Sequence, residues 1–332
     1  MTGIKLIGTG MYIPETVATN EDFTKIVDTS DEWITKRTGI KERHPSNGEP
    51  TWYMGVQAAK QAMEDAGVTP DEIDMVISTS VTGDYYTPST ANIMQGKLGI
   101  HKAFSIDINC ACAGFVYGFD MAQRYIAMDD DVKTVLIISS ENITKLVDYE
   151  DRSTCVLFGD GAGAAVVTAG PNRCYTYLEC EAQDANKIYA QNARPGNAFT
   201  TQEGREKYLD LFPQGREHYM HMDGRDVYKF ATRAMPEGLH KACEKAGIKV
   251  EDLALIIPHQ ANYRIIETAA KNLGLSMDHF YLNIDRYGNI SSACIPVCLN
   301  ELKRAGRLKE GDKIALVGFG AGLVYGATVF TI

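Results

Sequence analysis

Three residues that lie far apart in this sequence are of types that together support acyl transfer. Cys112 stands in the segment Asn-Cys-Ala-Cys-Ala-Gly-Phe, His259 in Pro-His-Gln-Ala-Asn, and Asn289 in Arg-Tyr-Gly-Asn. A cysteine thiolate forms a thioester, and a neutral imidazole and a carboxamide both donate hydrogen bonds to an oxyanion. We therefore predict that these three side chains meet in one active site for acyl transfer.

Each of the three also has a plainer interpretation when it is taken alone. Cys112 precedes an apolar stripe that predicts a helix to about residue 126. A helix start lowers the pKa of a thiol, but a cysteine is as often a small core residue, which is our interpretation of Cys110. His259 follows a predicted buried strand and could be an ordinary histidine, and Asn289 could shape a turn or cap a helix. The active-site prediction depends on all three together.

The composition of the whole chain excludes several classes of protein. Its 332 residues, 45% hydrophobic and 23% charged, suit one large or two medium globular domains. A net charge of −10 argues against a general nucleic-acid binder. No apolar run approaches the roughly 18 residues of a membrane span, and no signal peptide is evident. We expect the eight cysteines to be free thiols in the cytoplasm, and we expect no metal site.

The chain matches itself at an offset of 180 residues. Residues 61–77 align with 241–257, Asn109 falls on Asn289, Cys112 falls on Ser292, and the apolar run 134–138 falls on 314–318. Three matches at one offset without gaps favour a duplication over chance similarity. Each copy predicts a helix closed by glycine, an acidic turn and a buried strand, which indicates an α/β class with helices covering mixed sheets.

The duplication predicts where the active site is assembled. We divide the chain into an N-terminal half, 1–175, and a C-terminal half, 176–332, with 181–217 as an insertion or long loop rich in polar residues. Cys112 then belongs to the first half, and His259 and Asn289 belong to the second. A site at the seam between related halves explains how residues so distant in sequence can meet.

Five motifs in order resemble those of a known family, 3-oxoacyl-acyl-carrier-protein synthase III. They are Ala111–Phe115, Phe158–Gly163, Pro258–Asn262, Tyr287–Asn289 and Gly318–Gly322. The resemblance implies the thiolase-like fold, a duplicated αβαβα sandwich with mixed five-stranded sheets, and a homodimer. It implies the initiating condensing enzyme of type II fatty-acid synthesis, with acyl-coenzyme A and malonyl-acyl-carrier protein as substrates and no cofactor.

The resemblance also implies a mechanism. Cys112 takes the primer acyl group from acyl-coenzyme A, and His259 and Asn289 stabilise the enolate that forms as malonyl-acyl-carrier protein loses carbon dioxide. That carbanion attacks the Cys112 thioester, and the backbone N–H groups of Cys112 and Ala321 hold the tetrahedral oxyanion. Donors without an acidic proton suit this step, because an acid would quench the carbanion.

Other positions carry over from the family one by one. Trp33 and Arg152 match residues that sandwich the adenine of coenzyme A. Five more match residues along its binding path: Arg37, Thr38, Met222, Gly224 and Asn262. A basic surface for the acidic carrier protein is implied at Lys229, Arg264 and Lys271, where the plainer interpretation is solvated surface charge. Thr87 and Phe319 are the expected acyl-pocket residues.

Two departures from the family pattern bear on the primer. The segment 181–217 is longer than the compact pattern that we expect, and Thr87 replaces a Phe that in some relatives crosses the dimer interface. A related enzyme of secondary metabolism, with another acyl donor or acceptor, is the nearest alternative. A cysteine hydrolase is a distant one: the order Cys, His, Asn and the spacing fit papain-like peptidases, but the local signature around the cysteine is absent.

Overall fold

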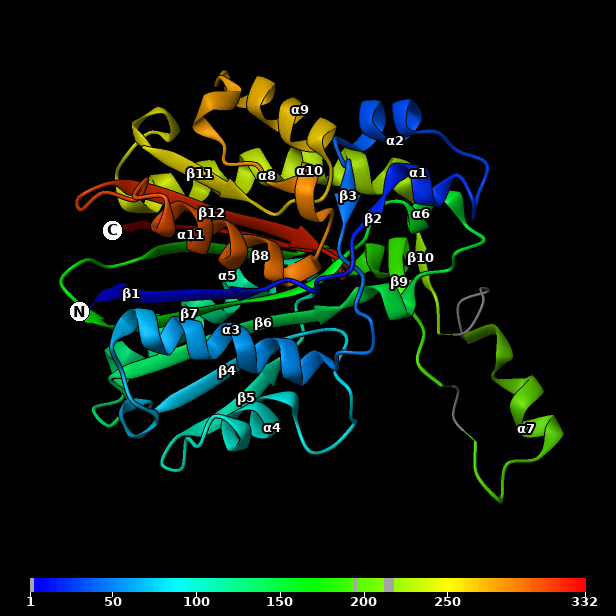
Figure 1. Cartoon of the computed structure of the whole chain (residues 1–332), viewed down its shortest axis with the longest axis horizontal. Coiled ribbons are helices and arrows are strands. Elements are labelled where there is room, and N and C mark those ends of the chain that lie inside the picture. The colour runs from blue at the N-terminus through cyan, green and yellow to red at the C-terminus, as the bar shows by residue number, and fades with distance from the viewer. Residues whose placement is uncertain (1–2, 194–195, 212–217) are drawn as a thin grey trace.

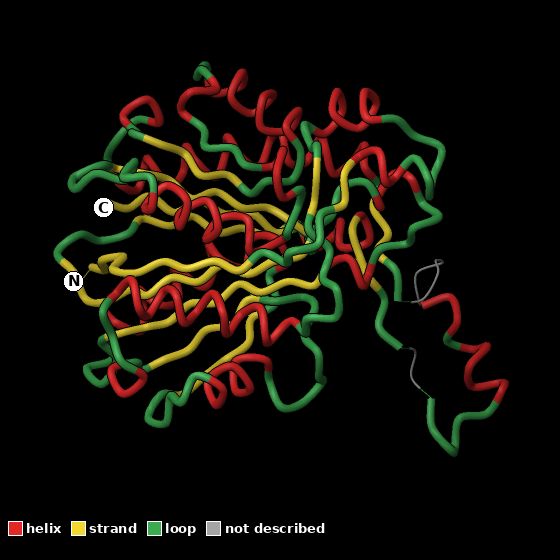
Figure 2. Tube along the Cα trace, in the orientation of Figure 1, coloured by secondary structure: helices red, strands yellow, loops and turns green. Residues whose placement is uncertain are grey.

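The computed structural model describes residues 3–193, 196–211 and 218–332, and its centre is two mixed β-sheets (Figures 1 and 2). The first sheet has the strand order β1-β7-β6-β4-β5, and the second has the order β8-β13-β12-β11. In the first sheet β4 is parallel to both of its neighbours, and in the second β11 is parallel to β12; the other pairs of neighbouring strands are antiparallel. The strands of the first sheet are β1 (Gly3–Tyr12), β4 (Met75–Thr79), β5 (Phe104–Ile108), β6 (Thr134–Asn142) and β7 (Asp160–Gly170). Those of the second are β8 (Tyr175–Cys180), β11 (Leu255–Pro258), β12 (Lys313–Gly320) and β13 (Val324–Thr331).

Helices form three layers around these sheets, so that the order is helix, sheet, helix, sheet, helix. Two helices lie between the sheets and contact both, α5 (Gly114–Met128) and α11 (Cys294–Arg304). The outer face of the first sheet is covered by α3 (Thr51–Ala66) and α4 (Thr90–Lys97), and that of the second by α8 (Gly224–Ala246) and α9 (Tyr263–Leu273). Strand β4 is buried along its whole length because helices cover both faces. This is the predicted αβαβα sandwich.

Shorter elements complete the described chain. The small helices are α1 (Asn20–Phe23), α2 (Asp31–Thr38), α6 (Arg152–Cys155), α7 (Gln202–Lys207) and α10 (Ile284–Tyr287). The 3₁₀ turns are η1 (Pro70–Glu72), η2 (Ala111–Ala113), η3 (Ile143–Leu146), η4 (Ala182–Lys187), η5 (Leu209–Leu211), η6 (Val250–Asp252), η7 (Met277–His279) and η8 (Ser291–Ala293). Two short ribbons pair β2 (Ala18–Thr19) with β3 (Glu42–Arg43), and β9 (Ile188–Ala190) with β10 (Met220–Met222).

Equivalent elements recur at the offset seen in the sequence. Helices α3 and α8 both end at a left-handed glycine, Gly67 and Gly247, and each is followed by a 3₁₀ turn and a buried strand. The turns η2 and η8 also lie 180 residues apart, and the first residue of each has a positive φ, 46° at Ala111 and 52° at Ser291. The same backbone path therefore leads into both central helices. The residue at which the two halves divide stays a prediction.

The second sheet differs from the prediction of five strands, because its described part has four. Where a fifth strand would pair with β11, Phe280 makes a single parallel bridge to Ile256. The buried side chain of Gln260 takes the place of further ladder bonds: its amide N–H₂ donates to the carbonyl of Tyr281, and its oxygen accepts from the N–H of Asn283. A side chain thus satisfies backbone groups that a strand would otherwise pair.

The described residues of the segment 181–217 fall into two parts. The first part includes β9, which pairs with β10 in the body of the molecule. The part that contains α7 projects away from both sheets (Figure 1). Residues 194–195 and 212–217 of this segment lie outside the described residues. Phe199, Tyr208 and Leu211 in the projecting part are exposed, so this part contributes little to the core.

None of the helices in the described part of the chain is both long and apolar enough to span a membrane.

Candidate active site

Cys112 lies in η2, the tight turn that leads from β5 into α5. The Oδ1 atom of Asn109 accepts a hydrogen bond from the N–H of Ala111 at 3.3 Å, which supports the left-handed conformation of that residue. Strand β12 passes very close to this turn: a Cβ atom added at Gly320 would lie 2.7 Å from the Cys112 nitrogen. Glycine is required there because any side chain would push the nucleophile out of place.

The pKa of the Cys112 thiol is raised, whereas its position at a helix start predicts a lowered pKa. Burial raises the pKa to about 12, although a hydrogen bond with Ser291 lowers it in part. Desolvation of the charged form therefore outweighs the attraction of the helix terminus for a thiolate. In the unliganded protein Cys112 is a neutral thiol, and its activation has to accompany acyl transfer.

His259 follows β11 directly and is almost fully buried. Its backbone N–H donates to the carbonyl of Val317 on β12 at 2.8 Å, and the edge of its ring meets the ring of Phe319 with centroids 5.3 Å apart. Burial lowers the pKa of His259 to about 3, and its Nδ1 atom has no hydrogen-bond partner among the described residues. The imidazole is therefore neutral at physiological pH and can donate one hydrogen bond to a ligand.

Asn289 follows the short helix α10, and its backbone N–H and carbonyl both form hydrogen bonds with the segment between α6 and β7. Its N–H donates to the carbonyl of Leu157 at 2.9 Å, and its carbonyl accepts from the N–H of Gly159 at 3.1 Å. Its Oδ1 atom accepts from the N–H of Ser291 at 2.9 Å. Because the amide oxygen is occupied in this way, the N–H₂ group is the part of the side chain that can donate to an anion.

These three side chains line one cavity of about 880 Å³. The backbone of Ala321, the second predicted oxyanion donor, lines it as well, and so does Phe319. The structure therefore brings together residues that the sequence separates by up to 177 positions, from Cys112 to Asn289. The cavity is the only place in the described structure where the three predicted chemical groups meet.

Six of the seven predicted coenzyme A residues line the same cavity. It is lined by Trp33, Arg37, Thr38, Met222, Gly224 and Asn262. Arg152 is not part of that lining, but its guanidinium lies 4.8 Å from the centre of the Trp33 ring and donates to the carbonyl of Asp28. An adenine ring between Trp33 and Arg152 needs about 3.5 Å on each face, so Arg152 has to move for the predicted sandwich to form.

The predicted carrier-protein residues lie on the surface, and one of them, Arg264, also lines the cavity. Arg264 is exposed and donates from Nε to the carbonyl of Lys36, in the helix that also carries Arg37. Lys229 and Lys271 are exposed too, but each is paired on its own helix, with Asp226 at 3.3 Å and Glu267 at 3.5 Å. Such exposed pairs are weak, so both ammonium groups can still meet an acidic partner.

The second predicted acyl-pocket residue, Thr87, does not line the cavity. It is exposed in the loop between β4 and α4, next to Tyr85 and Tyr86, which are also exposed. A role in setting acyl-chain length would therefore require a second subunit, and it stays a prediction. Within the described residues, no group of three or more His, Cys, Asp or Glu side chains is arranged to hold a metal ion.

Two residues beside the cavity were not singled out from the sequence, Glu141 and Ser291. Glu141 is fully buried at the end of β6, and Ser291 donates to it at 3.0 Å. One signal was available: Glu141 is the only charged residue in the run 134–142, which is otherwise apolar or small and polar. A carboxylate in such a strand indicates a buried polar site.

Comparison with known proteins agrees with this geometry. The family model described as 3-oxoacyl-[acyl-carrier-protein (ACP)] synthase III matches residues 106–183, and the model of its C-terminal part matches residues 243–332. A beta-ketoacyl-[acyl-carrier-protein] synthase III of Clostridium acetobutylicum is 43% identical over 331 residues, covering 99% of this chain and 98% of the relative. The chain belongs to the 3-oxoacyl-acyl-carrier-protein synthase III family. It is therefore an acyltransferase, a condensing enzyme of the type that initiates fatty-acid synthesis.

Solved structures of synthase III relatives share the whole fold. The crystal structure of 3-oxoacyl-[acyl-carrier-protein] synthase III from Aquifex aeolicus VF5 has a TM-score of 0.89 at 41% identity, covering 99% of this chain and 100% of that one. The priming beta-ketosynthase of the R1128 polyketide pathway has a TM-score of 0.88 at 31% identity, covering 99% and 96%. The more similar relatives are synthase III proteins, which favours that function over secondary metabolism or hydrolysis.

The length of the synthase III relatives corrects one expectation. Because the Clostridium acetobutylicum protein aligns over 98% of its own length with 99% of this chain, the segment 181–217 does not make the chain longer than that relative.

Proposed function

We propose that Cys112 takes an acyl group from acyl-coenzyme A and that His259 and Asn289 then promote decarboxylation of malonyl-acyl-carrier protein. The observation that carries this proposal is the meeting of the three side chains in one cavity that is open to the surface near Trp33. Acyl-coenzyme A and the malonyl carrier are both substrates in this scheme, so it needs no resident cofactor.

The first half-reaction is transfer of the primer. As the Cys112 sulfur attacks the thioester carbonyl, its thiol proton passes to solvent. The bond between the acyl carbon and the coenzyme A sulfur then breaks, and the departing coenzyme A thiolate takes a proton from solvent. The N–H groups of Cys112 and Ala321 line the cavity and would hold the oxyanion that forms during the attack. Burial of the thiol keeps it protonated until the acyl donor binds and aligns its carbonyl with the sulfur.

The second half-reaction forms the carbon–carbon bond. Loss of carbon dioxide from the malonyl group leaves an enolate, whose oxygen would accept hydrogen bonds from His259 and from the N–H₂ group of Asn289. Both donors are uncharged, which suits this step because neither is acidic enough to protonate the carbanion. The carbanion then attacks the Cys112 thioester, and the thiolate leaves and regains a proton.

The two substrates would enter along the mouth of the cavity. Trp33, Arg37 and Arg152 would bind the nucleotide of coenzyme A, with Thr38, Met222, Gly224 and Asn262 along its pantetheine arm. Arg264, Lys229 and Lys271 would steer the acidic carrier protein, because a local basic surface attracts an anionic partner even on a chain of net negative charge. A cytoplasmic location is part of the same proposal.

A homodimer is also proposed, and edge strand β5 supports it. Phe104 and Ile106 on this strand are 45% and 37% exposed, and β5 pairs with β4 on one side only. An open edge with apolar side chains is a template for pairing with a second strand, and pairing around a two-fold axis would join two copies into one continuous sheet. Thr87 would then approach the cavity of the partner.

The direct test follows each half-reaction separately. Incubation with acetyl-, isobutyryl- and octanoyl-coenzyme A should add one acyl group to Cys112, as measured by peptide mass spectrometry, and Cys112→Ser should lose condensation. Asn289→Ala should release carbon dioxide from malonyl-acyl-carrier protein about 10²–10³-fold more slowly, the scale for one lost oxyanion donor, and should acylate Cys112 at nearly the normal rate. Acyl label on Cys110, or unchanged decarboxylation in the variant, would refute the assignment.

A further inference from the structure

The buried carboxylate of Glu141 lies where the two halves of the molecule meet, beside the cavity. It is fully inaccessible to solvent and accepts five hydrogen bonds. Burial raises its pKa, and the hydrogen bonds lower it, the hydroxyl of Thr82 first among them. The net effect is a raised pKa. None of the five donors is a basic side chain, so hydrogen bonds alone hold this carboxyl group in the described structure.

The two oxygens of Glu141 divide between the halves. Oε2 accepts from the first half: from the Thr82 hydroxyl at 2.7 Å, the Val81 N–H at 3.1 Å and the Ser80 hydroxyl at 3.3 Å. Oε1 accepts from the second half, from the hydroxyls of Ser291 at 3.0 Å and Ser292 at 2.9 Å. One side chain therefore ties the loop after β4 to the turn η8.

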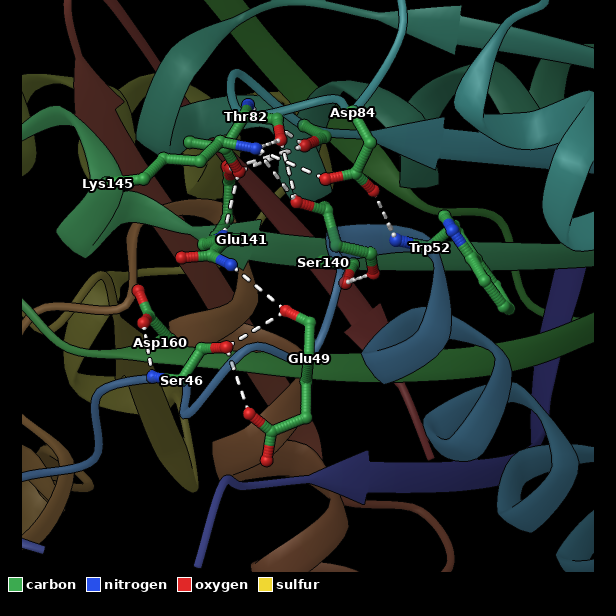
Figure 3. Close-up of polar contacts among 12 residues, drawn as sticks. Ser46, Glu49, Trp52, Thr82, Asp84, Ser140, Glu141, Lys145 and Asp160 are labelled. Atoms are coloured by element: carbon green, nitrogen blue, oxygen red, sulfur yellow. Dashed lines mark hydrogen bonds and ion pairs between the residues drawn. The ribbon is translucent and has the colours of Figure 1, made fainter. Parts of the chain in front are cut away.

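The first-half side of this connection is itself firmly anchored (Figure 3). Lys145 donates to the carbonyl of Thr82 and forms an ion pair with Asp84 at 3.3 Å, and Asp84 accepts from the N–H of Trp52 at the start of α3. The Thr82 hydroxyl also accepts from the N–H of Asn142 at 2.8 Å. Because of these contacts, Glu141 has a rigid base from which to hold η8.

The second-half side leads to the proposed enolate donors. Ser291 donates its hydroxyl to Glu141 and its N–H to Oδ1 of Asn289, so the two bonds set the direction of the Asn289 amide. The backbone of Ser291 also lies against the His259 ring. Ser292, which aligns with Cys112 in the repeat, is wholly buried, and its hydroxyl donates a hydrogen bond to Glu141.

We propose that Glu141 is a positioning residue for the decarboxylation half-reaction: through Ser291 it holds the Asn289 amide in register with Cys112. This inference rests on the function proposed above and assigns Glu141 no contact with substrate. Because Cys112 belongs to η2 and is held by β12 and α5, loss of the Glu141 connection should affect Asn289 more than the nucleophile.

Glu141→Gln tests this inference because its effect falls on one side of the connection. The Val81 N–H can only donate, and the Thr82 hydroxyl already accepts from Asn142, so the amide oxygen of Gln should stay on the first-half side. Its N–H₂ then faces the two serines. Ser292 can turn its proton to the Thr79 carbonyl, 3.0 Å away, but Ser291 loses its acceptor.

The expected result is a change in the ratio of the two half-reactions. In Glu141→Gln, kcat for carbon dioxide release from malonyl-acyl-carrier protein should fall about 10–100-fold, since small misplacements of a catalytic group cost this much. KM for the malonyl carrier should stay within about twofold, and acylation of Cys112 should change by less than about threefold. Ser291→Ala should lower carbon dioxide release by a similar factor, and that rate decides the question if Glu141→Gln does not fold. Its acylation rate is not a control, because the Ser291 hydroxyl also forms a hydrogen bond with the Cys112 thiol.

Thr82→Val is the matched control. It removes a buried donor from Oε2 but leaves the Val81 and Ser80 donors and both serine bonds to Oε1 in place, so it should lower Tm and leave the ratio of half-reactions unchanged. Equal loss of both half-reactions in Glu141→Gln, no loss in either, or the same altered ratio in Thr82→Val would overturn the inference. If the unaltered protein does not decarboxylate malonyl-acyl-carrier protein, the proposed function fails and the inference fails with it.

Discussion

Burial governs the protonation of Cys112 and His259 at the cavity. Cys112 and His259 are both desolvated, which raises the pKa of the thiol to about 12 and lowers that of the imidazole to about 3. Both groups are therefore neutral near pH 7, in contrast with the thiolate–imidazolium pair of cysteine peptidases. A neutral pair suits condensation, because the imidazole keeps its role as a hydrogen-bond donor and carries no proton acidic enough to quench a carbanion.

This protonation state predicts how Cys112 reacts in the free protein. Below its pKa the thiolate fraction rises about tenfold for each pH unit, so alkylation of Cys112 by iodoacetamide should keep rising from pH 7 to pH 9. Peptide mass spectrometry measures the rate at this one site, with Cys112→Ala giving the background from other cysteines. A rate that levels off below pH 7 would show a stabilised thiolate and contradict the assignment.

At the scale of elements, close approach between strand and turn places the nucleophile. Strand β12 lies against η2 only because Gly318 and Gly320 have no side chains, and a Cβ atom at Gly318 would lie 3.0 Å from the Cα atom of Ala113. On the same strand, the carbonyl of Val317 accepts a hydrogen bond from the backbone N–H of His259, and Ala321 follows the last residue of the strand. A single strand therefore positions Cys112, His259 and Ala321, the proposed nucleophile, enolate donor and oxyanion donor, relative to one another.

Gly320→Ala should therefore damage the site more than the fold. The new Cβ atom would lie 2.7 Å from the Cys112 nitrogen, so backbone has to move, at a cost of about 1–3 kcal/mol of stability. We expect acylation of Cys112 to fall by at least about tenfold. Gly96→Ala in α4 is the control: its Cβ atom meets nothing within 4 Å, and the helix should gain slightly. Equal acylation rates in the two variants would mean that the close approach does not position Cys112.

At the scale of the whole molecule, duplication puts the site at the seam between two similar halves. The second half retains the turn of the first, but a buried Ser292 stands where the first half has Cys112. One copy of the turn provides the nucleophile, and the other provides structural contacts to Glu141. The halves therefore differ in function although their backbones match.

The same scale includes the proposed dimer, which Ile106→Lys should disrupt. A buried charge without a partner at the centre of a paired edge is costly, so sedimentation should show the mass of one chain for the variant and of two for the unaltered protein. Val17→Lys is the control, since Val17 is also exposed, at 46%, and lies outside both sheets. A monomeric unaltered protein, or a dimeric Ile106→Lys variant, would refute pairing through β5.

Features of this protein that depend on near neighbours and on repetition are predictable from the sequence alone. The glycine-closed helices, the buried strands and the offset of 180 residues were all visible, because helix caps and apolar patterns are local. The choice of Cys112, His259 and Asn289 came from residue type and motif, and their meeting in one cavity agrees with it.

Properties that depend on packing between distant segments are visible in the folded chain and not in the sequence. The pKa of Cys112 rises because segments distant in the sequence bury the thiol, which outweighs the local effect of the helix start. The second sheet lacks a full fifth strand because Gln260 bonds to backbone more than 20 residues away. The role proposed for Glu141 depends on the hydrogen bond that it accepts from Ser291, which lies 150 positions further along the chain. No local sequence pattern specifies such a contact.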